Sequence, residues 1–216
     1  EMAELWNSTR QNMIKFIEYS RKDADLSMKL LIQKGMLDKF FELSKISGVL
    51  LQDTFGGQTK RIETMLLHEF KKRDVVMSSS HSRQELYRRT KERQEKELKG
   101  ATVLEPKKGL HADTCVIVLD FKSLYPSIMR TYNISPDSVL TTDAADLKHH
   151  ESPTGTLFVD QDLYKGIFPS VLERLIETRS KIKELMKTKT GEERRILNAK
   201  QLALKDMSNS FYGYTG

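Results

Sequence analysis

The sequence predicts an α+β fold that is mostly helical, and three patterns lead to this prediction. Apolar residues recur at helical spacing through residues 1–77. Two further long helical patterns occupy residues 167–210. Between them, Val116-Ile117-Val118-Leu119 is a short apolar run rich in β-branched residues, which is typical of a strand buried on both faces of a sheet.

The composition describes a polar chain with a basic bias. Of the 216 residues, 38% are hydrophobic and 31% are charged, and the formal net charge is +6. A positive balance favours a polyanionic partner. No run of about 18 apolar residues occurs, so the sequence predicts no membrane partner. Neither an initiator Met nor a signal peptide opens the chain, which favours an internal piece of a longer protein.

The single cysteine, Cys115, stands at the head of the apolar run. This position predicts a buried structural thiol. One cysteine excludes a disulfide framework and a Cys/His zinc site of ordinary spacing, which is typical of an intracellular compartment such as the cytoplasm or nucleus.

The first 77 residues are expected to form several helices, with Gly35 and Gly48 between them. Tyr19 and Asp23 are four residues apart, so they share one face of a helix. By itself, this pair is more simply a solvated surface pair.

Residues 78–100 have a different composition. Between residues 83 and 99, seven Lys or Arg accompany four Glu, a net charge of 7 − 4 = +3. A solvated helix or a linker is the expected structure. A strip that contacts phosphates is the alternative.

The apolar run ends on a carboxylate, Asp120. A carboxylate that follows a buried strand needs a partner, and a metal ion is a natural one. The simpler alternative is a solvated Asp in a turn. Residues 133–137 are expected to form a turn, and residues 141–166 a polar hairpin or loop region.

A helix is predicted from Ile167 to about residue 187, with Pro169 tolerated in its first turn. Gly191 ends it, and a second helix follows over residues 192–210, which makes an antiparallel hairpin. Arg179 and Lys183 fall inside the apolar stripe of the first helix. Snorkelling of their charges to water is the alternative explanation. Four polar residues share one face of the second helix, which a solvated face also explains: Asn198, Gln201, Lys205 and Asn209.

Two long motifs resemble those of the family B (α-like) DNA polymerases. Residues 120–128 read D-F-K-S-L-Y-P-S-I and resemble the first catalytic palm motif, D-x-x-S-L-Y-P-S-I. Residues 205–213 read K-D-M-S-N-S-F-Y-G and resemble the fingers motif K-x-x-x-N-S-x-Y-G. The family also carries an Arg and a Lys four residues apart on the partner helix, which Arg179 and Lys183 match. Tyr19 and Asp23 resemble its third exonuclease motif.

The resemblance implies the central part of such a polymerase. Its expected segments are the end of the 3′–5′ exonuclease domain with connecting helices (1–77), a charged linker and palm entry (78–110), the palm (111–166), the fingers hairpin (167–210) and a return to the palm (211–216). The palm is expected to contribute a partial β-sheet. The Leu98-Gly100-Ala101 element resembles a template-contacting element, but Leu98 stands where the family usually has Tyr.

The resemblance also implies residue roles. Asp120 is expected to be catalytic and to hold two Mg²⁺ ions, with the backbone carbonyl of Phe121 as a further ligand. Backbone N–H groups of Ser123 and Leu124 are expected to meet the triphosphate. Catalytic Tyr125 is expected to pack under the sugar and favour deoxynucleotides. The remaining implied residues are the triphosphate-binding Arg179, Lys183, Lys205 and Asn209, Tyr212 and Gly213 near the nascent base pair, and the exonuclease residues Tyr19, which orients water, and Asp23, which holds a metal.

The implied reaction is DNA-directed DNA polymerisation, in which a primer 3′-hydroxyl attacks the α-phosphate of a dNTP with two metal ions. The implied partners are primer-template DNA and dNTP, and a sliding clamp is a further candidate. The family's second palm carboxylate lies in a D-T-D motif that this sequence lacks. The isolated chain is therefore expected to be inactive. Two alternatives stay open: one half of a split polymerase that needs a second chain, or a non-catalytic module that binds nucleotides or nucleic acid.

Overall fold

The protein is represented by a computed structural model. It describes residues 6, 9–77, 84, 87–88, 91, 102–113, 115–141, 144 and 146–215. Helices dominate the described residues and a single small two-stranded sheet accompanies them, which confirms the predicted fold class. The Leu98-Gly100-Ala101 element and most of the charged linker lie outside the described residues.

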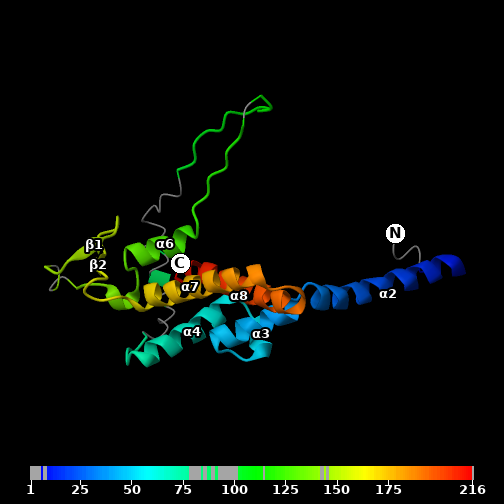
Figure 1. The fold of residues 1–216 in the computed structure, drawn as a ribbon, viewed down its shortest axis with the longest axis horizontal. Helices are drawn as coiled ribbons and strands as arrows, with labels where there is room; N and C mark the ends of the chain where they lie inside the picture. Colours follow the sequence, from blue (N-terminus) through cyan, green and yellow to red (C-terminus); the bar gives the residue numbers. More distant parts are fainter. Residues whose placement is uncertain are drawn as a thin grey trace.

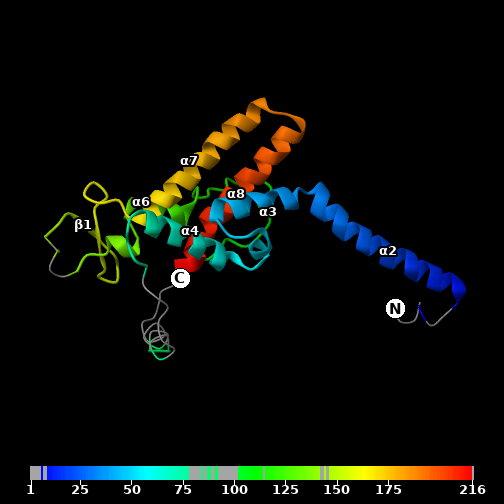
Figure 2. The same cartoon turned by 90° about the horizontal axis from the view of Figure 1, so that it is seen from below.

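The N-terminal region consists of α2 (Arg10–Gln33), α3 (Met36–Ser47), the 3-10 helix η1 (Leu51–Phe55) and α4 (Gln58–Lys72). Gly35 and Gly48 separate helices as predicted, and their φ angles of 63° and 76° lie in the left-handed region that glycine adopts without strain. Gly48 also packs closely, since a Cβ there would lie 2.7 Å from the His68 ring. Helix α2 projects away from the other helices (Figures 1 and 2).

Helices α7 (Ile167–Thr188) and α8 (Gly191–Thr215) form the predicted antiparallel hairpin, and Figure 2 shows them side by side. Gly191 makes the turn with a φ of 57°. Helix α8 continues five residues beyond the predicted end at residue 210. Its last turns therefore carry Tyr212 and Gly213 on a helix.

The core lies where α3 and α4 pack against the base of the helical hairpin. Helix α4 buries apolar residues at helical spacing, and α7 and α8 do the same. An aromatic chain joins three helices, because the ring of Phe168 lies 6.4 Å from that of Phe70 and 5.7 Å from that of Phe211. The most deeply buried core residues are Leu43, Ile62, Leu66, Ile167, Val171, Leu172, Ala203, Met207 and Phe211.

Two polar links tie α4 to the start of α7. Glu69 accepts a hydrogen bond from the Nη1 of Arg174 at 3.0 Å, and its other carboxylate oxygen lies 2.9 Å from the Nη2 of the same arginine in an ion pair. Arg73 donates to the Lys165 carbonyl and to the Ser170 hydroxyl, both at 2.8 Å. Burial opposes ionisation of Glu69, but Arg174 and Lys72 outweigh that effect and hold the pKa of this carboxyl below its usual range.

Replacing Glu69 by Gln is expected to lower the free energy of unfolding by about 1 kcal/mol at pH 7. A carboxyl with a depressed folded-state pKa stabilises the fold above its unfolded pKa, near 4.5, and that stability is lost as the pH falls through the folded value. The difference between parent and variant should therefore shrink in acid. Urea denaturation at several pH values measures it. Glu184→Gln, at an exposed pair with Lys187 on α7, is the matched control.

The remaining elements lie before α7. They are α6 (Leu124–Thr131), the 3-10 helix η2 (Pro136–Ser138) and the strands β1 (His149–Glu151) and β2 (Leu157–Val159). The strands pair antiparallel, with His150 opposite Phe158. This pair is the hairpin expected within residues 141–166.

The prediction of a buried strand at residues 116–119 is wrong. These residues lie in an extended excursion away from the helices (Figure 1), and their side chains are 70–90% exposed. Cys115 is also exposed, contrary to the expected buried thiol. A strand requires a hydrogen-bonded neighbour, and no strand among the described residues pairs with this run. No helix in the described part of the chain is long and apolar enough to cross a membrane.

Candidate functional site

A pocket of about 310 Å³ lies between the turn that precedes α6 and the helical hairpin. It gathers side chains from three segments that are far apart in the sequence. Its lining residues are Asp120, Phe121, Lys122, Ser123, Ile176, Arg179, Ser180, Lys183, Lys205, Ser208 and Asn209. Seven of these eleven are site residues expected from the sequence.

The first wall of the pocket is a tight turn. Ser123 has a φ of 56°, in the left-handed region, and this conformation turns the chain from the extended segment into α6. Ser127 holds the turn, because its N–H donates to the Ser123 carbonyl at 2.9 Å and its hydroxyl to the Lys122 carbonyl at 3.3 Å. Asp120 and Phe121 therefore enter the pocket directly before a helix N-terminus.

The helical hairpin forms the second wall. Arg179 and Lys183 lie four residues apart on α7, and Lys205 and Asn209 lie four apart on α8. This spacing puts each pair on one helix face, and both faces line the pocket. The two cations inside the apolar stripe of α7 therefore line a polar cavity.

Hydrogen bonds orient the arginine. The Nε of Arg179 donates to the Oε1 of Gln201 at 3.2 Å, and Gln201 donates onward to Asn198 at 2.9 Å. Gln201 is buried, whereas Arg179 is half-buried. Neither Arg179, Lys183 nor Lys205 forms a salt bridge with a carboxylate of the described residues.

The charge of the pocket suits a polyanion. Four cationic side chains, including Lys122, face one carboxylate, Asp120. Their mutual repulsion is relieved when an anion enters. Arg binds phosphate oxygens in pairs, and Lys supplies a compact charge. The arrangement can therefore grip a phosphate chain from two helices at once.

Two tyrosines stack beside this pocket. The rings of Tyr125 on α6 and Tyr212 on α8 have centroids 4.1 Å apart and planes 11° from parallel. Both side chains are half-exposed. Leu124, at the start of α6, and Gly213, in the last turns of α8, do not line the pocket.

The sequence of the chain was compared with those of known protein families. Residues 50–216 match the model for DNA polymerase family B. The chain belongs to DNA polymerase family B. The predicted resemblance is thereby confirmed.

Relatives of this family B chain include DNA polymerase delta catalytic subunits. It is 32% identical to that of Candida albicans over 223 residues and 32% identical to that of Drosophila melanogaster over 227 residues. Both comparisons cover 100% of this chain and 20% of the relative, so the chain spans about a fifth of their length.

A solved structure agrees with the sequence comparison. The family B DNA polymerase of the archaeon Pyrobaculum calidifontis superposes with a TM-score of 0.67 and 32% identity. The superposition covers 99% of this chain and 26% of that one. The helical arrangement described above is thus shared with a family B polymerase.

A metal ion fits this family B pocket only in part. Asp120 is the sole carboxylate among the described residues that line it, and the Phe121 carbonyl belongs to the same turn. Mg²⁺ prefers several oxygen ligands in octahedral geometry. Across the described residues, no three His, Cys, Asp or Glu side chains come together as a ligand set. The described residues therefore supply a share of a Mg²⁺ site and too few ligands for two ions.

The two residues that the sequence assigned to an exonuclease motif lie elsewhere. Tyr19 and Asp23 are exposed on α2, the helix that projects from the core (Figure 2). The structure places them on one helix, as predicted, and does not bring them to the pocket.

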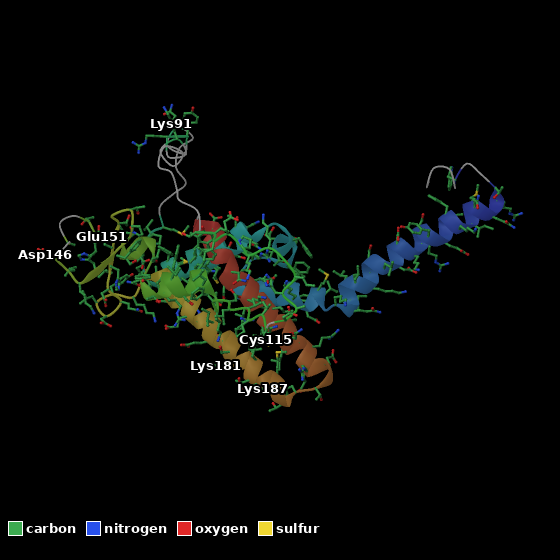
Figure 3. All side chains as sticks on the ribbon, turned by 90° about the horizontal axis from the view of Figure 1, so that it is seen from above. Lys91, Cys115, Asp146, Glu151, Lys181 and Lys187 are labelled. Atoms are coloured by element: carbon green, nitrogen blue, oxygen red, sulfur yellow. The ribbon has the colours of Figure 1, made fainter. Side chains whose placement is uncertain are left out.

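Sequence reasoning missed four lining residues: Lys122, Ile176, Ser180 and Ser208. Each is adjacent to, or one helical turn from, a predicted site residue. This proximity in the sequence could have indicated that they line the same pocket. Two other lysines of α7, Lys181 and Lys187, are labelled in Figure 3 and are exposed outside the pocket lining.

Proposed function

We propose that this family B chain supplies the nucleotide-binding part of the active centre of a DNA-directed DNA polymerase. The supporting observation is the pocket, where Asp120 faces Arg179, Lys183 and Lys205 across a space of about 310 Å³. The four cationic side chains and the one carboxylate among the described lining residues leave a net positive charge, which complements the negative charge of a dNTP triphosphate.

In this proposal the helical hairpin holds the triphosphate. Arg179 binds phosphate oxygens through its guanidinium, Lys183 and Lys205 neutralise the chain of phosphates, and Asn209 donates a hydrogen bond. The backbone N–H groups of Ser123, which lines the pocket, and of Leu124, the next residue along the same turn, meet the phosphates from the opposite side. Because both walls act together, the α-phosphate is held at the Asp120 turn.

Asp120 and the Phe121 carbonyl would hold Mg²⁺ together with triphosphate oxygens and at least one carboxylate from outside the described pocket. When bound, divalent ions activate the primer 3′-hydroxyl and stabilise the leaving oxygen. The chain's own part is to orient the triphosphate for in-line attack. Tyr125, supported by its stack on Tyr212, packs under the sugar and favours deoxynucleotides.

The wider context follows from the same proposal. Primer-template DNA and dNTP are the substrates, a sliding clamp is a candidate partner, and the setting is intracellular, in cytoplasm or nucleus. Tyr19 and Asp23 belong to the end of a 3′–5′ exonuclease domain.

The chain alone is expected to bind a fluorescent dATP analogue with Mg²⁺ and to leave a labelled primer unextended and undegraded. One pocket carboxylate suffices for binding, whereas two-metal chemistry needs more. Fluorescence anisotropy measures binding, and gel analysis of a 5′-labelled primer-template measures extension.

Efficient extension by the chain alone would contradict the need for a second carboxylate. Absence of analogue binding would contradict the nucleotide site. Extension that arises only after mixing with a second chain bearing a D-T-D motif would identify half of a split polymerase. Binding that leads to no extension in any assembly would identify a non-catalytic module.

A further inference from the structure

The N-terminus of α7 is capped by a loop that lies about thirty residues earlier in the chain. The Ile167 N–H donates to both carboxylate oxygens of Asp137, at 3.0 and 3.2 Å. The Phe168 N–H donates to the Ser135 hydroxyl at 3.2 Å. Pro169 has no N–H, and the Ser170 N–H reaches the Gly166 carbonyl at 3.1 Å. Side chains from outside the helix therefore satisfy its free N–H groups.

Asn133 holds the segment that leads into the same helix. It is fully buried, with a φ of 55°, two residues after α6 ends. Its side-chain amide donates to the carbonyls of Val159 at 2.7 Å and Tyr164 at 2.8 Å, and its Oδ1 accepts from the Gly166 N–H at 2.9 Å. One side chain thus connects the end of α6, the end of β2 and the start of α7.

The loop packs closely against the start of α7. A Cβ added at Gly166 would lie 2.7 Å from the Ser135 Cβ, so a glycine is required there. The Tyr164 hydroxyl donates to Asp137 at 2.6 Å, and the Ser138 hydroxyl donates to the Ser135 carbonyl at 2.9 Å. The carboxylate of Asp137 also complements the positive end of the helix dipole.

This loop connects the two walls of the nucleotide pocket. Helix α6 begins at the Asp120 turn and ends just before Asn133, while α7 carries Arg179 and Lys183. At 1.5 Å per residue, Arg179 lies about 18 Å along α7 from Ile167. A tilt of about 5° at the base would therefore move Arg179 by roughly 1.6 Å. Displacements of about 1 Å can cost about 10²-fold in the rate of an oriented reaction.

We propose that Asn133, Ser135 and Asp137, here named the α7 seat, are positioning residues that set the distance between the Asp120 turn and the phosphate-binding cations of α7. This inference rests on the proposed nucleotide site. The seat touches no phosphate. It acts by holding the helix that does.

The first test measures binding of a fluorescent dATP analogue with Mg²⁺ by the 216-residue chain and its seat variants. Asp137→Asn and Ser135→Ala are expected to weaken binding by about fivefold to tenfold, and Asp137→Ala by more, because Asn keeps one acceptor oxygen. Asp162→Asn and Ser152→Ala are matched controls in the same region. Asp162 pairs with Lys148 and Ser152 holds the β-hairpin turn, so binding should change by less than about twofold.

A second measurement does not depend on nucleotide. With Cys115→Ser as background, nitroxide labels at Ile128→Cys on α6 and Lys187→Cys on α7 report the distance between the two helices. Seat variants are expected to shift or broaden this distance distribution, and the control variants to leave it unchanged. Circular dichroism and thermal unfolding confirm that each variant is folded at the assay temperature. If Asp137→Ala does not fold, Asp137→Asn and Ser135→Ala decide the result.

The outcomes separate the two proposals. Failure of the unmodified chain to bind the analogue overturns the nucleotide site. Normal binding and an unchanged distance distribution in seat variants that only melt at lower temperature overturn the positioning role and leave a purely structural cap. Weaker binding together with an altered distance supports the seat.

Discussion

Under the proposed function, replacing Asp120 by Asn in a complete polymerase assembled with this chain is expected to abolish Mg²⁺-dependent primer extension, with a rate loss of ~10³-fold or more. Asp120 is the one carboxylate that the described part of the chain contributes to the pocket, and an amide of the same size lacks the charge that a divalent ion requires. Single-turnover extension of a labelled primer at saturating dNTP measures the chemical step.

The same variant should behave oppositely without metal. In EDTA, Asp120→Asn is expected to bind a triphosphate at least as tightly as the parent, because a negative charge has been removed from a cationic pocket. Asp113→Asn, an exposed carboxylate of the extended segment outside the pocket, should leave both properties unchanged. Parent-like extension by Asp120→Asn would refute its role as a metal ligand.

Replacing Lys205 by Gln is expected to weaken binding of the Mg²⁺-dATP analogue by about 10- to 100-fold, the value of one charged hydrogen bond to phosphate. Lys205 lines the pocket from α8 and has no salt bridge with a described carboxylate, so its charge is available to the ligand. Anisotropy titrations at two salt concentrations measure the loss. The effect should diminish at higher salt, because ions screen an exposed charge.

Lys181→Gln and Lys187→Gln remove the same charge from α7 outside the pocket (Figure 3). Each of these variants lowers the net charge by one, as Lys205→Gln does, but leaves the proposed contact between Lys205 and the phosphate in place. Equal losses in all three variants would show that affinity follows the overall charge of the chain, and the assigned grip would then be wrong.

The helical hairpin was predictable because its signals are local. The apolar stripe of α7, the break at Gly191 and the two cations inside the stripe are all properties of neighbouring residues, and the structure has the hairpin in that place. The structure of residues 116–119 was not predictable in the same way. Its apolar run shows that the segment needs a partner, but a strand forms only where a second strand is present.

The residues of the pocket were predictable from the family resemblance, whereas the contacts that support the pocket were not. Helical spacing alone places Lys205 and Asn209 on one helix face, and the resemblance added the expectation that this face binds a triphosphate. Asn133 and Asp137 looked like ordinary turn residues. Their contacts cap a helix thirty residues away, and no local pattern encodes which distant N–H group a turn side chain will meet.

The two walls of the pocket differ in how firmly the fold holds them, because the run at residues 116–119 is exposed. The cations stand on helices that are fixed by the core, whereas Asp120 ends a segment whose backbone joins no β-ladder among the described residues. Ordering such a segment costs about 1–2 kcal/mol of conformational entropy per residue. A partner strand that pairs with residues 116–119 would order this segment before a metal ion binds. The affinity of Asp120 for a divalent ion would then be higher when the strand is paired, so metal binding would report whether the partner strand is present.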